Sequence, residues 1–257
     1  MGLWTTTHLY QIVPTFLVLA ILSVLITKLL AKCKQSLKYI PLKVIAVILL
    51  IMEIGKQIYA FDKDGTYDLY ALPFHYCSLF LYLLPFHAFY HGKRSHITNA
   101  AAFSCLASLS LDMILMPAVI YSDGNIKNFF NSYGDFHTVA FHNLVVFYFM
   151  LTIALRLYAL RPARDLKIVS IFLAIYVTIA ATLSYTLKVN YHNLYHCNIG
   201  FIEDIRTAVV ARIGVIGILI YIATLFVLTI LFAYAAYFLT RLITTEINKI
   251  GKKRAKE

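Results

Sequence analysis

Residues 71–86 read ALPFHYCSLFLYLLPF, and this stretch is apolar enough to lie within a lipid bilayer. It nevertheless carries His75 and Cys77, a base and a nucleophile two positions apart. The rest of the chain is similar in character, because 61% of the 257 residues are hydrophobic and only 14% are charged. These fractions are far from those of a soluble domain, so the sequence predicts an integral membrane protein.

Seven segments are long enough to cross a membrane as helices. The hydrocarbon core is about 30 Å thick and a helix rises about 1.5 Å per residue, so each crossing needs about 20 mostly apolar residues. The sequence therefore predicts an all-α bundle of seven transmembrane helices in one domain over residues 1–257. The predicted helices are residues 10–30, 41–60, 71–90, 97–120, 135–158, 166–187 and 213–239. We interpret the first as a retained helix rather than a signal peptide, because no Lys or Arg precedes its apolar run.

The distribution of Lys and Arg predicts how the bundle is oriented. Seventeen of the 23 fall on the side that holds the C-terminus, and one, Lys56, lies within the second crossing. The five on the other side are Lys63, Lys127, Lys188, Arg206 and Arg212. Seven acidic residues also collect there: Asp62, Asp64, Asp68, Asp123, Asp135, Glu203 and Asp204. Since cationic residues in short loops mark the cytoplasm, we expect a multi-pass cell-membrane protein with an external N-terminus and a cytoplasmic C-terminus.

The formal net charge of +11 could otherwise suggest a nucleic-acid partner. We interpret it as a topology signal, so no nucleic acid is expected, and the cytoplasmic face is expected to attract anionic lipid headgroups. The basic tail NKIGKKRAKE, residues 248–257, is interpreted as a solvated charge run. The four cysteines form no disulfide framework, and no cofactor is expected.

Four reactive side chains on four predicted helices lie at a similar depth. Counted at about 1.5 Å per residue from the outer helix ends, Glu53 lies about 10 Å deep, Cys77 about 9 Å, Asp112 about 12 Å and His142 about 10 Å. Ionisable groups in hydrocarbon are costly and generally face the bundle interior. Their chemistry fits nucleophilic acyl transfer through a thioester, with Cys77 as nucleophile, His142 as base and Asp112 as the acid that orients it. Glu53 is an alternate orienting acid.

The angular positions of these residues around a helix indicate which of them can face the same pocket. His75 lies about 200° from Cys77 around an ideal helix, so the two face one pocket only if Pro73 distorts the first turn. His137 and His142 are five residues apart, about 140° around the helix, and depth favours His142.

Other interpretations of the same residues stay open. A free cysteine in an apolar helix is often only a small hydrophobe, the histidines can be interhelical hydrogen-bond partners, and Glu53 and Lys56 can neutralise each other. A zinc site is another interpretation, because His137, His142 and Asp112 could supply ligands, as could the side chains of residues 192–204. Neither spacing matches a strong zinc signature, so no metal is predicted.

Four segments carry a family resemblance: MEIGKQIY (52–59), LPFHYCSL (72–79), FHTVAFHN (136–143) and NYHNLYH (190–196). In this order they resemble the YwaF-like family of bacterial membrane proteins, which includes animal relatives of the transmembrane-protein-164 type. The resemblance implies a phospholipid acyltransferase that depends on a membrane-embedded cysteine and histidine. It places the cysteine at Cys77 and the histidines at His137 and His142. We expect the supporting or substrate-binding residues to be Glu53, His137, His75 and Asn190.

The leading hypothesis is therefore a phospholipid acyltransferase or lipid hydrolase whose substrate is a membrane phospholipid or its acyl chain. A second hypothesis is a transporter or proton-coupled carrier in which Glu53, Asp112 and His142 line a polar pathway, although no inverted repeat supports it. A third is a non-enzymatic seven-helix receptor or assembly subunit that binds a partner through its external loops and His137.

Overall fold

The computed structural model describes residues 4–61 and 65–254, with the side chains of Val119 and of residues from 246 onward outside the description. Within these residues every regular element is a helix, and the only β-type pairing is an isolated bridge between Phe61 and Tyr67. The predicted all-α class is therefore confirmed. Asp62, Lys63 and Asp64, which entered the charge count, lie outside the described residues, as does the end of the basic tail.

The elements in chain order are α1 (Thr6–Leu29), α2 (Gln35–Lys38), α3 (Ile40–Tyr59), η1 (Leu69–Ala71), η2 (Tyr76–Ser78), α4 (Leu79–Phe89), α5 (Ser95–Leu115), η3 (Pro117–Val119), α6 (Asp123–Lys127), α7 (Tyr133–Ala154), α8 (Pro162–Leu187), η4 (Tyr191–Asn193), α9 (Gly200–Ile213) and α10 (Val215–Arg254). Here η denotes a short 3₁₀ helix.

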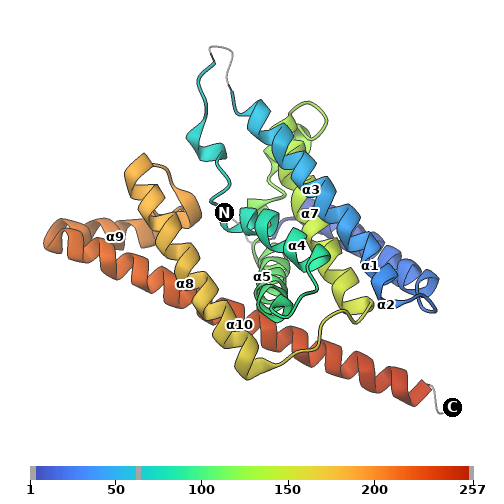
Figure 1. The fold of residues 1–257 in the computed structure, drawn as a ribbon. Coiled ribbons are helices and arrows are strands. Elements are labelled where there is room, and N and C mark those ends of the chain that lie inside the picture. The colour runs from blue at the N-terminus through green and yellow to red at the C-terminus, as the bar shows by residue number, and fades with distance from the viewer. Residues whose placement is uncertain (1–3, 62–64, 255–257) are drawn as a thin grey trace.

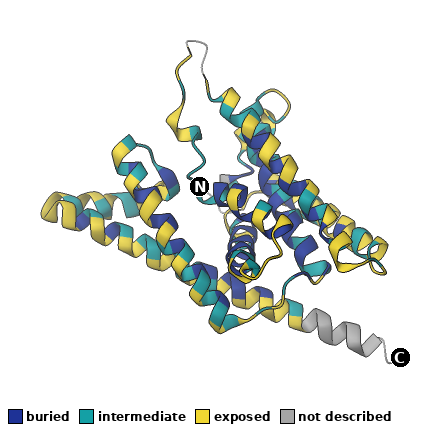
Figure 2. Ribbon diagram, in the orientation of Figure 1, coloured by how far each residue is buried: buried dark blue, intermediate teal, exposed yellow. Residues whose placement is uncertain are grey.

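Two helices form the centre of the bundle. α7 packs on α1, α3 and α5, while α5 packs on α4, α8 and α10 (Figure 1). Buried residues concentrate where these helices meet, whereas α9 has none (Figure 2). Many large apolar side chains are exposed on the outer faces of the helices, as expected where the surrounding solvent is hydrocarbon.

Among the described residues, five helices are long and apolar enough to cross a membrane: α1, α5, α7, α8 and α10. They correspond to five of the seven predicted crossings. α3 has 20 residues but carries Lys43, Glu53 and Lys56. The remaining apolar helix, Tyr76–Phe89, is shorter than a crossing requires. The chain is thus a multi-pass helical protein, and the two remaining crossings stay predictions.

The prediction of a regular helix over residues 71–90 is wrong in its first half. The α-helix begins only at Leu79, after an irregular segment, residues 68–75, that contains the 3₁₀ turn η1 and that we call the strap. Pro73 is the physical reason, because proline has no N–H to donate and forces the preceding residue into an extended conformation. Leu72 has φ −56° and ψ 141°, as this rule requires.

The carbonyl groups of the strap are paired within the protein, as irregular backbone would require at membrane depth, because lipid offers no hydrogen-bond donors. Each carbonyl from Leu69 to Phe74 accepts a hydrogen bond within the protein. The donors are Tyr191 Oη to Leu69, His75 Nε2 to Tyr70, Gln57 Nε2 to Ala71, the Phe74 N–H to Leu72, Tyr82 Oη to Pro73 and Tyr176 Oη to Phe74. The non-helical conformation is therefore fully paired on its carbonyl side.

The C-terminal part contains a helix that was not predicted. α9 precedes α10, which begins at Val215 and extends well beyond the expected end at residue 239. Gly214 joins them with φ 57° and ψ −131°, a conformation that glycine adopts without steric cost. Two residues into α10, a Cβ at Gly217 would lie 3.0 Å from the backbone of Val210, so the absence of a side chain allows the two helices to approach.

Candidate functional site

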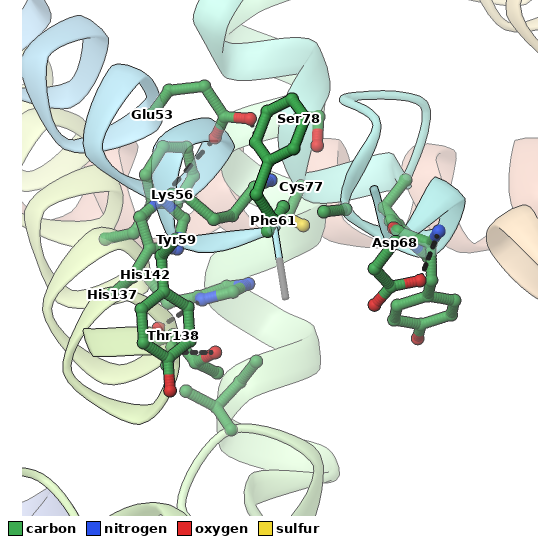
Figure 3. A pocket seen from close by; sticks show the side chains of 17 residues that line it. Glu53, Lys56, Tyr59, Phe61, Asp68, Cys77, Ser78, His137, Thr138 and His142 are labelled. Carbon is green, nitrogen blue, oxygen red and sulfur yellow. Dashed lines mark hydrogen bonds and ion pairs between the residues drawn. The ribbon is translucent and has the colours of Figure 1, made fainter. Parts of the chain in front are cut away.

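A cavity of about 870 Å³ lies between α3, α7 and the strap. Its volume falls within the range of about 300–1,000 Å³ that is usual for small-molecule sites. The sequence-predicted residues among its lining are Glu53, His75, Cys77, His137 and His142, joined by Lys56, Asp68, Tyr70, Ser78 and Thr138. We call this space the main cavity (Figure 3).

Cys77 lies in the 3₁₀ turn Tyr76–Ser78 that leads directly into α4. Its thiol is free, and its sulfur faces the main cavity, opposite the imidazole of His142 (Figure 3). The positive end of the helix dipole at this turn stabilises negative charge on an atom placed there. The position is therefore compatible with a thiolate once a base has taken the proton.

The orientation of His142 is fixed by its own helix. Its Nδ1–H donates a hydrogen bond to the backbone carbonyl of Thr138, one turn earlier in α7, at 2.6 Å. A carbonyl can only accept, so Nδ1 carries the proton and the neutral ring keeps a lone pair on Nε2. Within the described residues no hydrogen bond to Nε2 occurs. His142 thus presents a proton acceptor to the cavity that Cys77 also lines.

Glu53 is the centre of a charged network on the α3 side. Its Oε1 lies 2.8 Å from Lys56 Nζ and accepts from Gln57 Nε2 at 2.5 Å. Its Oε2 lies 3.4 Å from His137 Nε2 on α7. The Glu53–Lys56 pairing considered from the sequence is confirmed, and the network also joins α3 to α7 through His137.

α3 and α7 approach closely beside this network because of Gly55. A Cβ at this position would lie 2.2 Å from the hydroxyl oxygen of Tyr133 on α7. The same hydroxyl donates to the Met52 carbonyl at 2.7 Å. Gly55 therefore makes room for an aromatic ring that fixes the separation of the two helices.

His75 and Cys77 both line the main cavity, which an unbroken helix would prevent. Because the strap is not an α-helix, the separation of about 200° between His75 and Cys77 expected on a regular helix does not apply. The distortion expected at Pro73 is therefore present. His75 Nε2 donates to the Tyr70 carbonyl at 3.0 Å, and its ring packs on Tyr70 and Tyr191. These contacts indicate that His75 shapes the strap.

Two predicted residues lie elsewhere. Asp112 is half-buried in the last turn of α5 and is not among the residues that line the main cavity, so depth alone was a poor guide to its direction. Asn190 lies in the α8–α9 connection, where its Oδ1 accepts the N–H groups of Tyr195 and His196 at 3.1 and 3.2 Å. Its observed role is to fold that connection.

Several functional features were not predicted. Gln57 lies one turn after Glu53, and this i, i+4 spacing was a signal that could have identified it. Its amide connects Glu53 to the Ala71 carbonyl of the strap, and Tyr67 Oη donates to its Oε1. The Thr138 contact uses a backbone carbonyl, for which no residue type gives a signal. For the described part of the chain, no group of three or more His, Cys, Asp or Glu side chains could hold a metal ion.

A sequence model described as the TMEM164 family matches residues 3–234, most of the chain. The chain belongs to the TMEM164 family. The match agrees with the transmembrane-protein-164 type of relative expected from the four motifs, while the YwaF-like bacterial assignment stays a prediction. No curated protein and no solved structure matches the chain. TMEM164 membership and the five apolar helices together indicate a multi-pass membrane protein.

Proposed function

We propose that this protein is a membrane-embedded phospholipid acyltransferase or lipid hydrolase that forms a thioester on Cys77. The observation that carries the proposal is the tautomer of His142, whose Nδ1–H is held by the Thr138 carbonyl while Nε2 faces the cavity lined by Cys77. A thiol in apolar surroundings stays protonated unless a base accepts its proton, and His142 supplies that base.

In the first half-reaction, His142 Nε2 takes the proton of the Cys77 thiol as the sulfur attacks an ester carbonyl of the lipid. The carbon–sulfur bond forms, and the ester carbon–oxygen bond breaks. The departing alkoxide takes the proton back from His142 and leaves as a lysolipid hydroxyl. The products are an acyl thioester on Cys77 and a neutral imidazole.

In the second half-reaction, a hydroxyl attacks the thioester carbonyl while His142 Nε2 removes its proton. A new carbon–oxygen bond forms, the carbon–sulfur bond breaks, and the thiolate is reprotonated by His142. A lipid alcohol as acceptor gives acyl transfer, and water gives hydrolysis. The same two residues serve both outcomes.

The lipid substrate is supported by the family and by the surroundings of the site. The chain belongs to the TMEM164 family, the four-motif resemblance implies a phospholipid acyltransferase, and the main cavity lies among helices whose outer faces are apolar. Glu53 and His137 act as positioning residues that hold α3 and α7 around the cavity. We further propose that α3 and the strap with α4 complete seven crossings, because fully paired irregular backbone is tolerated at membrane depth.

The proposal is tested with purified protein and a phospholipid whose acyl chain carries an alkyne. We expect an acyl adduct on Cys77, seen as a mass increase that neutral hydroxylamine removes, and no adduct in Cys77→Ala. Cys105→Ala is the matched control, because Cys105 is fully buried and does not line the cavity. Labelling that persists in Cys77→Ala would reject the mechanism.

A further inference from the structure

A second, polar hollow of about 320 Å³ lies against the strap. Asp68 and Tyr70 line both this hollow and the main cavity, so the two spaces share a wall. The other polar lining residues, Lys188, Asn190, His196 and Asn198, come from the α8–α9 connection. The proposed acyl chemistry uses none of them.

The motif NYHNLYH builds this hollow. Asn190 accepts the N–H groups of Tyr195 and His196, which turns the connection back so that His196 and Lys188 line the same space. Tyr191 anchors the connection to the strap, because its hydroxyl donates to the Leu69 carbonyl and its ring packs on His75. The hollow and the main cavity are therefore parts of one assembly.

Three polar side chains of the hollow, those of Lys188, His196 and Asn198, are free to bind a ligand. Across residues 4–61 and 65–254, Lys188 forms no ion pair, and the side chains of His196 and Asn198 form no hydrogen bond. Lys56 in the main cavity differs, because its ammonium lies 2.8 Å from Glu53 and its charge is already compensated. Of these two lysines, only Lys188 is available to an anionic group.

Resting on the proposed function, we infer that the hollow binds the phosphodiester headgroup of the lipid whose acyl ester reaches Cys77. Lys188 gives the phosphate a charge-assisted hydrogen bond, and His196 and Asn198 supply further donors. The Asp68 carboxylate and the Tyr70 ring lie on the shared wall and suit a cationic group. The hollow thus matches a zwitterionic headgroup better than one with only negative charge.

The inference is tested by calorimetric titration of the full chain, purified in a maltoside detergent without phosphate, with dihexanoyl phosphatidylcholine. Lys188→Gln is expected to weaken binding by about fivefold, whereas Lys188→Arg keeps it. His196→Gln is a second variant expected to weaken binding. The matched control is Lys127→Gln, an exposed lysine on α6 outside both spaces. Equal affinity of Lys188→Gln and the unmodified protein, with equal melting temperatures, would overturn the inference.

Two further ligands distinguish the source of the phosphate. Dihexanoylglycerol, which has no phosphate, is expected to bind more weakly and without dependence on Lys188. Inorganic phosphate that competes as strongly as the lipid would overturn the lipid assignment. Cys77→Ala is expected to bind phosphatidylcholine like the unmodified protein, so loss of the headgroup site and loss of thioester chemistry are separate results.

Discussion

At the scale of single residues, a backbone carbonyl, and not a carboxylate, determines which ring nitrogen of His142 carries the proton. Asp112, the carboxylate expected behind His142, does not line the main cavity, and Glu53 lies beside His137 instead. A neutral acceptor on the helix cannot stabilise an imidazolium as strongly as a carboxylate does. It nevertheless fixes the ring and the tautomer, which are the requirements of a general base.

Replacing His142 by Gln is expected to lower the rate of Cys77 acylation by about a hundredfold, because general base catalysis contributes at least that much. His137→Gln is the matched control on the same helix. It alters the contact with Glu53 but leaves the proposed base in place, so it is expected to lower the rate much less than His142→Gln does. The measurement is the time course of the hydroxylamine-sensitive adduct. The opposite ranking of the two variants would assign the base to His137.

The sequence predicts that the four reactive side chains lie at a similar depth in the membrane. It does not predict which of them point toward the same cavity. Glu53, Cys77 and His142 line one cavity, while Asp112 does not, because depth follows from counting residues and direction follows from helix packing. His75 lines the cavity because the chain around it is not part of a regular α-helix. Pro73 indicated where the helix would be interrupted, but not that the irregular segment would extend from residue 68 to residue 75.

At the scale of elements, the α3–α7 contact controls the width of the main cavity. Gly55→Ala is expected to destabilise the protein by about 1–3 kcal/mol, the usual cost of overpacking, because the new methyl group meets the Tyr133 hydroxyl. The measurement is thermal unfolding in detergent. Gly200→Ala is the matched control, since nothing lies within 4 Å of a Cβ there. Equal losses in the two variants would contradict this account.

The start of α9 is held by an ion pair whose strength depends on pH. Hydrogen bonds from Arg206, and then the N–H of Cys197, lower the pKa of Glu203 from its ordinary value of 4.5 to about 2. A lowered carboxyl pKa gives stability that is fully present above about pH 4.5 and is lost as the pH falls through about 2.

Glu203→Gln mimics the protonated side chain and is expected to lower the melting temperature at pH 7. Since the unmodified protein loses the same ion pair in acid, the difference between the two should close as the pH falls from about 4.5 to about 2. The measurement is the melting temperature of both proteins across this range. A difference that does not change with pH would show that the charge of Glu203 is not responsible.

At the scale of the whole molecule, the uneven distribution of Lys and Arg predicts the sidedness of the bundle. In a Cys77→Ala background, Cys33 between α1 and α2 is the only native cysteine that is not buried. An impermeant maleimide is expected to label Cys33 in inside-out vesicles and an added Asn198→Cys in right-side-out cells. Labelling of Cys33 from outside intact cells would reverse the predicted orientation.

Hydropathy predicted most of the overall architecture, because a backbone that crosses lipid must pair all its polar groups internally and few structures do so. Helices α1, α3, α5, α7 and α8 begin and end within a few residues of their predicted limits. The strap and α9 were not predicted. The strap depends on contacts between residues as much as 122 positions apart, such as Tyr191 with Leu69. Local periodicity contains no information about such pairs.

Tyr176 and Tyr191 lie far C-terminal to the strap, and this order affects folding during synthesis. When a ribosome has produced only α3 and α4, Tyr176 and Tyr191 do not yet exist, so the carbonyls of Phe74 and Leu69 lack these partners. Hydrocarbon cannot substitute for them. We therefore expect the strap to reach its final conformation only after α8 and the segment that follows it have been inserted. A nascent chain cut before α8 would contain Cys77 and His142 but not Tyr176 and Tyr191, the donors that complete the strap.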